Sequence, residues 1–362
     1  MKNLSNRWGI SEFRLFWNVG VLVLALQFLG AIKPVTAEEI TVYRINAGSV
    51  RGEFVSSSPE KIVVKSRNSE VEISVADFRN LSVDEAPPEI DKARRNFDNN
   101  RFDEGLAELS GLTGVTGIAA EEAAYLKAFG SAMSASTGGA MSPKDAGSAT
   151  YEFTRNYPDS IHTYEIVEIL GRQLVDIGSD DLARAEFEKL ASANVPTIRG
   201  RGKLLLGQSQ LRLGDATGAQ KSFQELIESP ETSQEFLRLK SLAEPMLAKA
   251  LVENGNVEKA REMVNAVISR ENTENLENAE LFANCYNVLG LCHLKKGEME
   301  SALLDFLKTD LLFNSNPESH AEALFYLTTI GPQVQQNDLA FESREKLNQR
   351  YRNSLWAKKL NQ

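Results

Sequence analysis

The sequence has few of the residues that most often perform catalysis or bind metal ions. It contains only three histidines, His162, His293 and His320, and they are scattered along the chain. None of them belongs to an HExxH zinc pattern, and no glycine-rich phosphate loop or GxSxG nucleophile motif occurs. We therefore expect no catalytic residues, no bound cofactor and no metal ion.

Cysteine is equally scarce, which excludes a disulfide framework. The two cysteines, Cys285 and Cys292, fall on one expected helix. Their spacing places them about 10 Å apart along one helix face, which is too far for a disulfide bond. We interpret them as small buried apolar residues. The fold must then be stabilised by packing alone.

Positive charge is scarcer than negative charge. Lysine and arginine number 40 against 50 aspartates and glutamates, so the net charge is −10 at pH 7. Sequence-independent binding of nucleic acid needs clustered Lys and Arg, so nucleic acid is not an expected partner. An acidic chain of this kind is well solvated.

The N-terminal segment 1–37 has the composition of an export signal. Basic residues precede a largely apolar run at 19–32, and small or β-branched residues lead up to Ala37. The run is shorter than the roughly 20 apolar residues that a membrane-spanning helix needs. We predict cleavage after Ala37 and export to the periplasm or cell envelope. The alternative is an uncleaved signal that anchors the chain in the inner membrane.

Residues 38–85 are rich in β-forming residues. Five short runs are separated by turn-forming residues, and Val71, Ile73 and Val75 alternate with polar residues in the fourth run. The segment resembles an SH3-like or Sm-like domain, which implies a small five-stranded β-barrel. We expect it to serve as a docking module or as an N-terminal cap on the rest of the chain. Residues 86–88, Ala-Pro-Pro, are interpreted as a stiff linker.

One helical pattern recurs in the remaining chain and is clearest between Leu170 and Leu226. It consists of a small residue in a first helix, glycine at a turn, and alanine and a large apolar residue in a second helix. Its copies are 171/178/183/187, 207/214/219/223, 248/255/260/264 and 290/297/302/306. This order resembles the tetratricopeptide repeat (TPR).

The resemblance implies a mainly α fold, a TPR-type α-solenoid of antiparallel helix hairpins behind the small β-barrel. Residues 89–335 would form about six hairpins, and residues 336–362 would form polar capping helices. The segment from Phe153 to Tyr164 is similar to repeats of bacterial envelope proteins, namely periplasmic cell-division coordinators and outer-membrane assembly factors.

The first helix of each TPR hairpin lines the concave surface, so the resemblance also implies a binding groove. Arg, Lys, Asn and Gln side chains on such a surface can form hydrogen bonds with a peptide backbone and with carboxylates. The competing interpretation is a solvated helix face that binds nothing. The expected groove residues are Arg172, Arg201, Gln208, Lys249, Asn284 and Asn287.

Two functions remain open on the sequence alone. The first is a non-enzymatic protein–protein interaction scaffold in the cell envelope, which binds a peptide or a partner protein in the concave groove. The alternative is a structural, self-assembling envelope component that acts through the β segment or the solenoid ends. A hydrolase with an unrecognised site is a distant third. The sequence identifies neither the partner nor the oligomeric state.

Overall fold

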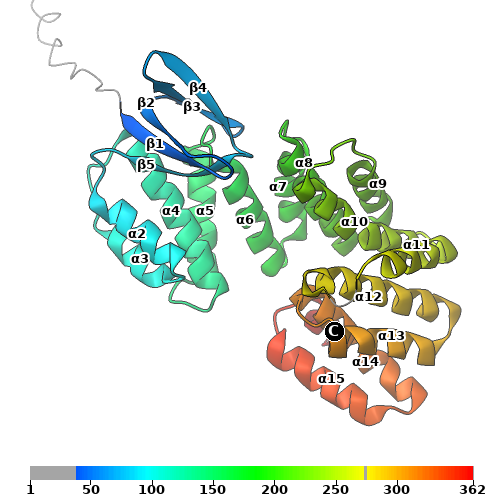
Figure 1. Ribbon diagram of the computed structural model, residues 1–362. Coiled ribbons are helices and arrows are strands. Elements are labelled where there is room, and N and C mark those ends of the chain that lie inside the picture. Colours follow the sequence, from blue (N-terminus) through cyan, green and yellow to red (C-terminus); the bar gives the residue numbers. More distant parts are fainter. Residues whose placement is uncertain (1–37, 273–274, 362) are drawn as a thin grey trace, which may run out of the picture.

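The computed structural model describes residues 38–272 and 275–361, and it places a β-sheet before a long helical array (Figure 1). The expected signal segment and its cleavage site after Ala37 lie outside the described residues. Within the described part, none of the helices is long and apolar enough to span a membrane.

The sheet is antiparallel and open. Its strands are β1 (Glu39–Arg44), β2 (Ser49–Ser57), β3 (Lys61–Ser66), β4 (Ser69–Ser74) and β5 (Phe78–Val83). They lie in the order β4-β3-β2-β1-β5, so β4 and β5 form two separate edges. The prediction of five strands is confirmed, but the prediction of a closed barrel is wrong.

The sheet stays open because helices cover its apolar face. Ile62, Val64 and Leu81 pack in one buried cluster with Ile118 and Ile161, which belong to the helical array. A second layer of helices removes the apolar face of a sheet from water, as closure into a barrel would also do. The two parts of the chain therefore share a core.

Hydrogen bonds fix the sheet on the helices. The backbone N–H of Ile118 donates to the Glu38 carboxylate over 2.8 Å, and that of Ile161 donates to the Ser57 hydroxyl over 2.9 Å. The sheet thereby covers the N-terminal end of the array, beside α4 to α6 (Figure 1).

Among the described residues, the helices pair as seven successive hairpins followed by one short helix. The first four hairpins are α2 (Pro88–Asp98) with α3 (Phe102–Ser110), α4 (Gly117–Ser136) with α5 (Pro143–Asn156), α6 (Thr163–Asp176) with α7 (Asp180–Ala191), and α8 (Pro196–Arg212) with α9 (Ala216–Ile227). The others are α10 (Gln234–Glu253) with α11 (Val257–Arg270), α12 (Ala279–Lys296) with α13 (Met299–Leu312), and α14 (Pro317–Ile330) with α15 (Asn337–Arg350). Two 3₁₀ turns, η1 (Leu276–Asn278) and η2 (Gly331–Val334), precede α12 and follow α14, and α16 (Leu355–Leu360) ends the fold.

The turn glycines of the repeat pattern all have a left-handed backbone. The φ angles of Gly178, Gly214, Gly255 and Gly297 are +83°, +79°, +83° and +78°. Glycine adopts this conformation at little cost, and it satisfies carbonyl groups at a helix C-terminus. The alignment of these four positions in the sequence therefore reflects one repeated turn.

A large apolar cluster runs through the second half of the array. It includes Phe223 and Phe306, both fully buried, and the two cysteines. Cys285 and Cys292 are unpaired thiols, as predicted. Burial raises the pKa of Cys285 to about 12 and that of Cys292 to about 11. Both thiols therefore behave as buried apolar groups.

Candidate ligand-binding cavity

The first helices of successive hairpins surround a cavity of about 870 Å³. Its wall comes mainly from α6, α8, α10, α12 and α14. The short helix α16 closes one side with Leu355, Trp356 and Lys359. A space of this size is within the range of ligand-binding pockets.

Four of the six groove residues predicted from the sequence line this cavity, namely Arg172, Gln208, Lys249 and Asn284. They come from four consecutive first helices, α6, α8, α10 and α12. The repeat alignment therefore brings them to one side of the array.

The other two predicted residues lie outside the cavity wall and hold helices together. Arg201 lies 3.3 Å from the carboxylate of Glu168 and 3.5 Å from that of Glu235. Asn287 is buried, and its side-chain amide donates to the backbone carbonyl of Ser319 over 2.8 Å. Asn287 thus ties α12 to α14.

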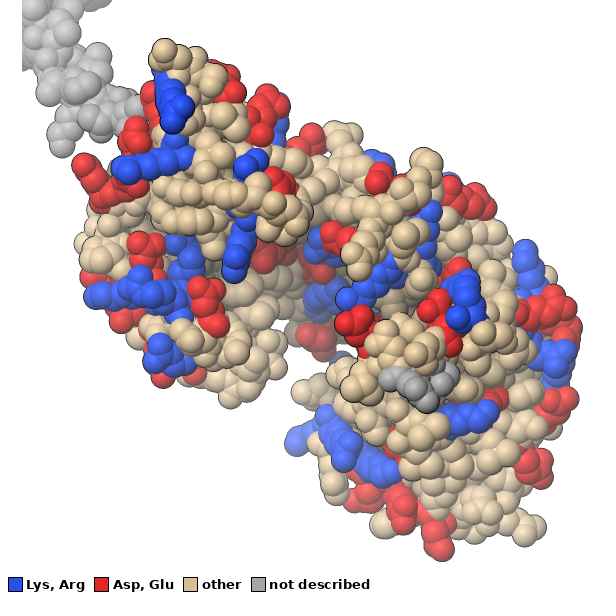
Figure 2. Space-filling view, in the orientation of Figure 1, with Lys and Arg blue, Asp and Glu red and all other residues tan. Residues whose placement is uncertain are grey.

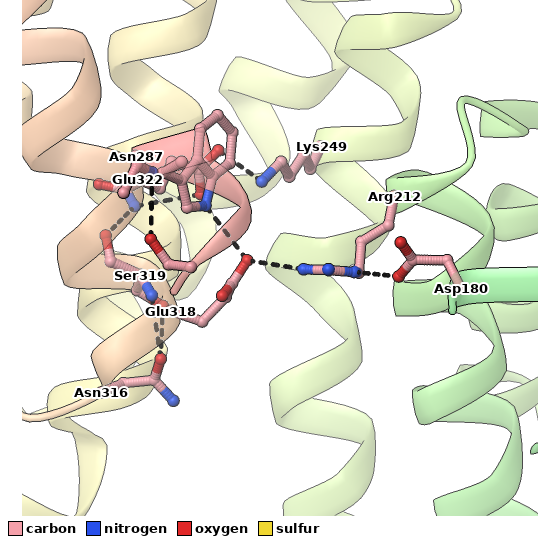
Figure 3. Close-up of polar contacts among 11 residues, drawn as sticks. Asp180, Arg212, Lys249, Asn287, Asn316, Glu318, Ser319 and Glu322 are labelled. Atoms are coloured by element: carbon pink, nitrogen blue, oxygen red, sulfur yellow. Dashed lines mark hydrogen bonds and ion pairs between the residues drawn. The ribbon is translucent and has the colours of Figure 1, made fainter. Parts of the chain in front are cut away.

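One arginine connects two distant parts of the array. Arg212 of α8 lies 2.6 Å from a carboxylate oxygen of Asp180 and 3.3 Å from one of Glu318 (Figure 3). Asp180 and Arg212 are both largely buried, whereas Glu318 keeps 56% of its side-chain surface accessible. This contact joins α14 to α7 and α8 across the cavity.

Trp356 fixes α16 at the cavity wall. Its indole N–H donates to Glu318 over 3.1 Å, and its ring packs in a buried cluster with Ala321 and Leu324 of α14. The ammonium groups of Lys249 and Lys359 lie 5.4 and 4.5 Å from the ring centroid. Cations at these distances are attracted to the face of an aromatic ring.

Negative charge predominates in the cavity lining, in which six carboxylates face four cations. The carboxylates are Asp176, Asp215, Glu253, Glu280, Glu318 and Glu322, and the cations are Arg172, Arg212, Lys249 and Lys359. On the face shown in Figure 2, basic and acidic side chains are intermixed. The cavity therefore shares the acidic balance of the whole chain, which has 50 carboxylates and 40 Lys and Arg.

The cavity also shifts the titration of its acids. Desolvation raises the pKa of the Asp176 carboxyl, although Arg212 and Arg172 oppose the shift. The pKa of Glu318 is raised in the same way, because atoms of the surrounding walls displace water from this partly accessible group. Burial and the nearby Lys249 lower the pKa of Lys359, while Glu322 and Glu253 oppose that change.

Sequence reasoning missed Arg212 and Trp356. Arg212 lies one helical turn beyond Gln208, at a position equivalent to Asp176 and Glu253 in neighbouring repeats, and all three line the cavity. Extending the predicted helix face by four residues would have found this row. Trp356 gave a weaker signal, as the one tryptophan of a polar C-terminal segment.

The three histidines lie elsewhere and pair with carboxylates. His162 lies 2.9 Å from Glu122, His293 lies 2.9 Å from Asp305, and His320 lies 2.8 Å from Asp310. Residues 38–272 and 275–361 contain no group of three or more His, Cys, Asp or Glu side chains that could hold a metal ion.

The comparisons with known proteins agree with the repeat architecture. Residues 246–310 match a family model described as tetratricopeptide repeat. No curated protein sequence matches the chain.

Several solved structures share the fold at low sequence identity. A tetratricopeptide repeat protein from Parabacteroides merdae superposes with a TM-score of 0.55 at 16% identity, over 75% of this chain and 95% of that one. A Rap protein complexed with Competence and Sporulation Factor gives 0.52 at 15% identity, over 75% and 77% of the two chains. The quorum sensor NprR from B. thuringiensis gives 0.52 at 11% identity, over 75% and 78%. The helical part of this chain thus has the fold of a tetratricopeptide-repeat solenoid, with the family match at residues 246–310.

Proposed function

We propose that the protein is a non-enzymatic interaction scaffold of the cell envelope, which binds a peptide or an extended segment of a partner protein in the concave cavity. The observation that carries this proposal is the cavity of about 870 Å³ lined by the first helices of consecutive hairpins. Helices with polar side chains around a deep groove suit an extended chain, whose backbone amides need hydrogen-bond partners.

Two of the similar structures support the proposal. One is a Rap protein crystallised with Competence and Sporulation Factor, and the other is a quorum sensor. The first is described as a complex with another molecule, and the second as a sensor. We infer that this chain uses its helical array in the same general manner, as a receptor surface.

Trp356 provides a direct test of binding, because it lies in the cavity wall. In a full-length chain with Trp8 and Trp17 replaced by Phe, Trp356 is the only tryptophan. We expect members of a mixed-sequence peptide library to change its fluorescence in a saturable manner. Gln208→Phe should weaken that response, since the larger ring narrows the cavity without breaking an ion pair.

The matched control is Gln349→Phe, at an exposed position on α15 outside the cavity lining. It should leave the response unchanged. A library without any active peptide would refute the proposal. Equal losses in the two variants would also refute it, because binding would then not depend on the cavity.

The envelope setting rests on the sequence of residues 1–37 and has its own test. Mass spectrometry of the protein isolated from the periplasmic fraction should give a chain that begins at Glu38. A chain that retains Met1 and sediments with the inner membrane would support the uncleaved anchor instead.

The alternative of self-assembly through the sheet has less support. The edge strand β4 carries the exposed carboxylates Glu70 and Glu72, and charges on an edge strand oppose pairing between copies. Light scattering over a range of protein concentrations tests it. An increase of mass with concentration would favour self-assembly.

A further inference from the structure

Three of the four cations in the cavity lining are already paired with carboxylates of the same chain, and the fourth, Lys359, lies over the ring of Trp356. Arg172 lies 2.9 Å from Glu168. Arg212 lies between Asp180 and Glu318, and Lys249 pairs with Glu322. An acidic ligand would have to compete with each of these pairs. Arg172, Arg212 and Lys249 therefore offer little attraction to a ligand carboxylate.

Several carboxylates of the wall, in contrast, have no such partner. Among the described residues, Asp176, Glu253 and Glu280 have no Lys, Arg or His nitrogen within 4.0 Å and no hydrogen bond. They lie on three different helices, α6, α10 and α12, around one cavity. Each of them is therefore able to pair with a cationic group of a ligand.

The environment of Asp176 makes its negative charge costly. Desolvation raises the pKa of Asp176, although cations nearby oppose the shift. Burial, assisted by the carboxylates of Glu322 and Glu253, also raises the pKa of the Tyr326 hydroxyl, which lines the same cavity. A cationic group placed in this space would stabilise the ionised carboxylates.

The chain itself supplies an example of the matching chemistry. Helix α16 is a basic segment with an aromatic residue, Leu-Trp-Ala-Lys-Lys-Leu, seated at the cavity wall. Lys358 attracts the carboxylate of Asp176, and Lys359 attracts those of Glu322 and Glu253. A basic segment is thus already accommodated on one side of the space.

We propose that the ligand of this cavity is a basic peptide segment, whose lysine or arginine side chains pair with Asp176, Glu253 and Glu280. This inference rests on the proposed function and specifies the class of ligand. Helix α16 remains in place as one wall, because Trp356 and Ala357 are buried in the core beneath it. The remaining volume of about 870 Å³ accommodates the peptide.

Fluorescein-labelled peptides of equal length test the ligand class on the full-length protein. One peptide alternates Gly and Lys, a second alternates Gly and Glu, and a third alternates Gly and Gln. Fluorescence anisotropy should show that the Lys peptide binds at least about tenfold more tightly than the Glu peptide. Added salt should weaken this binding, because salt screens charge pairs.

Variants locate the binding. Asp176→Asn with Glu253→Gln should reduce the affinity for the Lys peptide about fivefold or more. The control pair, Glu300→Gln with Glu345→Gln, removes the same charge from exposed sites outside the cavity and should have little effect. Glu280→Gln is a second, independent variant on α12, and circular dichroism verifies that each variant is folded.

The outcomes separate this inference from the proposed function. Equal or tighter binding of the Glu or Gln peptide would overturn the ligand class, and so would an equal loss in the control pair. If library peptides without basic residues change Trp356 fluorescence, the receptor function stands and the inference of a basic ligand fails. If neither assay detects a ligand, both fail.

Discussion

The side chain of Phe187 lies against the backbone of Gly171 so closely that a Cβ at Gly171 would be 2.4 Å from the ring. The same relationship recurs between Gly207 and Phe223 and between Gly290 and Phe306, at 2.5 and 2.6 Å. These contacts set the separation of the two helices in each hairpin. They explain why a small residue recurs in the first helix of the repeat.

Replacing these glycines should destabilise the array. Gly171→Ala or Gly290→Ala forces the facing ring or helix to move, and overpacking of this kind costs about 1–3 kcal/mol. The midpoint of urea unfolding, followed by circular dichroism, should decrease. Gly147→Ala in α5 is the control, since nothing lies within 4 Å of its added Cβ. It should raise stability by roughly 0.5–1 kcal/mol, because alanine favours helix.

Removal of the indole should loosen the C-terminal end of the array. Trp356→Ala removes the bond to Glu318 and leaves a cavity beside α14, a loss of about 3–5 kcal/mol in a well-packed site. Hydrogen exchange should accelerate in α14 to α16 and stay unchanged in α2 to α5. Phe341→Ala, at a side chain that is 67% exposed, should have no such effect. Uniform acceleration along the chain would contradict this local role.

The cysteines should be inert while the protein is folded. With pKa values raised to about 12 and about 11, Cys285 and Cys292 hold almost no thiolate at pH 8. A thiol reagent at pH 8 should therefore label neither cysteine in the native protein and both in urea. Rapid labelling of either thiol under native conditions would show that it is accessible.

Asp310 should make stability dependent on pH. Its carboxylate pairs with His320 at 2.8 Å and Lys346 at 2.9 Å. Although burial opposes the shift, these partners together hold its pKa below the ordinary value. A carboxyl with a depressed pKa stabilises the fold fully above its unfolded-state pKa, and this contribution is lost as the pH falls through its folded-state pKa. The free energy of unfolding should therefore decrease below about pH 4.

Asp310→Asn tests the assignment. It leaves Lys346 without its counter-charge and weakens the hydrogen bond to His320, and it should cost about 2–3 kcal/mol near neutral pH. The cost is smaller than for a fully buried pair because Lys346 is partly exposed. The decrease in stability below about pH 4 should also become smaller. The exposed Asp338→Asn is the control. An unchanged acid dependence in Asp310→Asn would assign that dependence to other carboxylates.

The sequence predicted the features that depend on local chemistry. Turn glycines such as Gly214 and small residues such as Gly207 each satisfy a requirement within one hairpin, so their spacing was visible in the chain. Whether the sheet closes into a barrel or stays open was not predictable in this way. Alternation of Val71 and Ile73 indicates a strand with one apolar face, but it does not indicate whether a facing strand or a helix covers that face.

The cavity could be predicted only in part. The repeat alignment identifies the helix face of Gln208 and Lys249, because every first helix presents the same face. It does not indicate that Arg212 meets Glu318, because that contact depends on the curvature accumulated over the intervening hairpins. Asn287 shows the same difficulty, since the approach of α14 converts an expected surface position into a buried one.

The contact between Arg212 and Glu318 depends on the number of hairpins that lie between them. A solenoid with free ends can gain or lose a hairpin at little cost, because each repeat contacts only its neighbours. Here two hairpins, α10 with α11 and α12 with α13, lie between the hairpins that carry Arg212 and Glu318. One hairpin more or fewer would carry α14 past α8 and open the cavity wall. Insertions that preserve this contact would therefore lie in the loops.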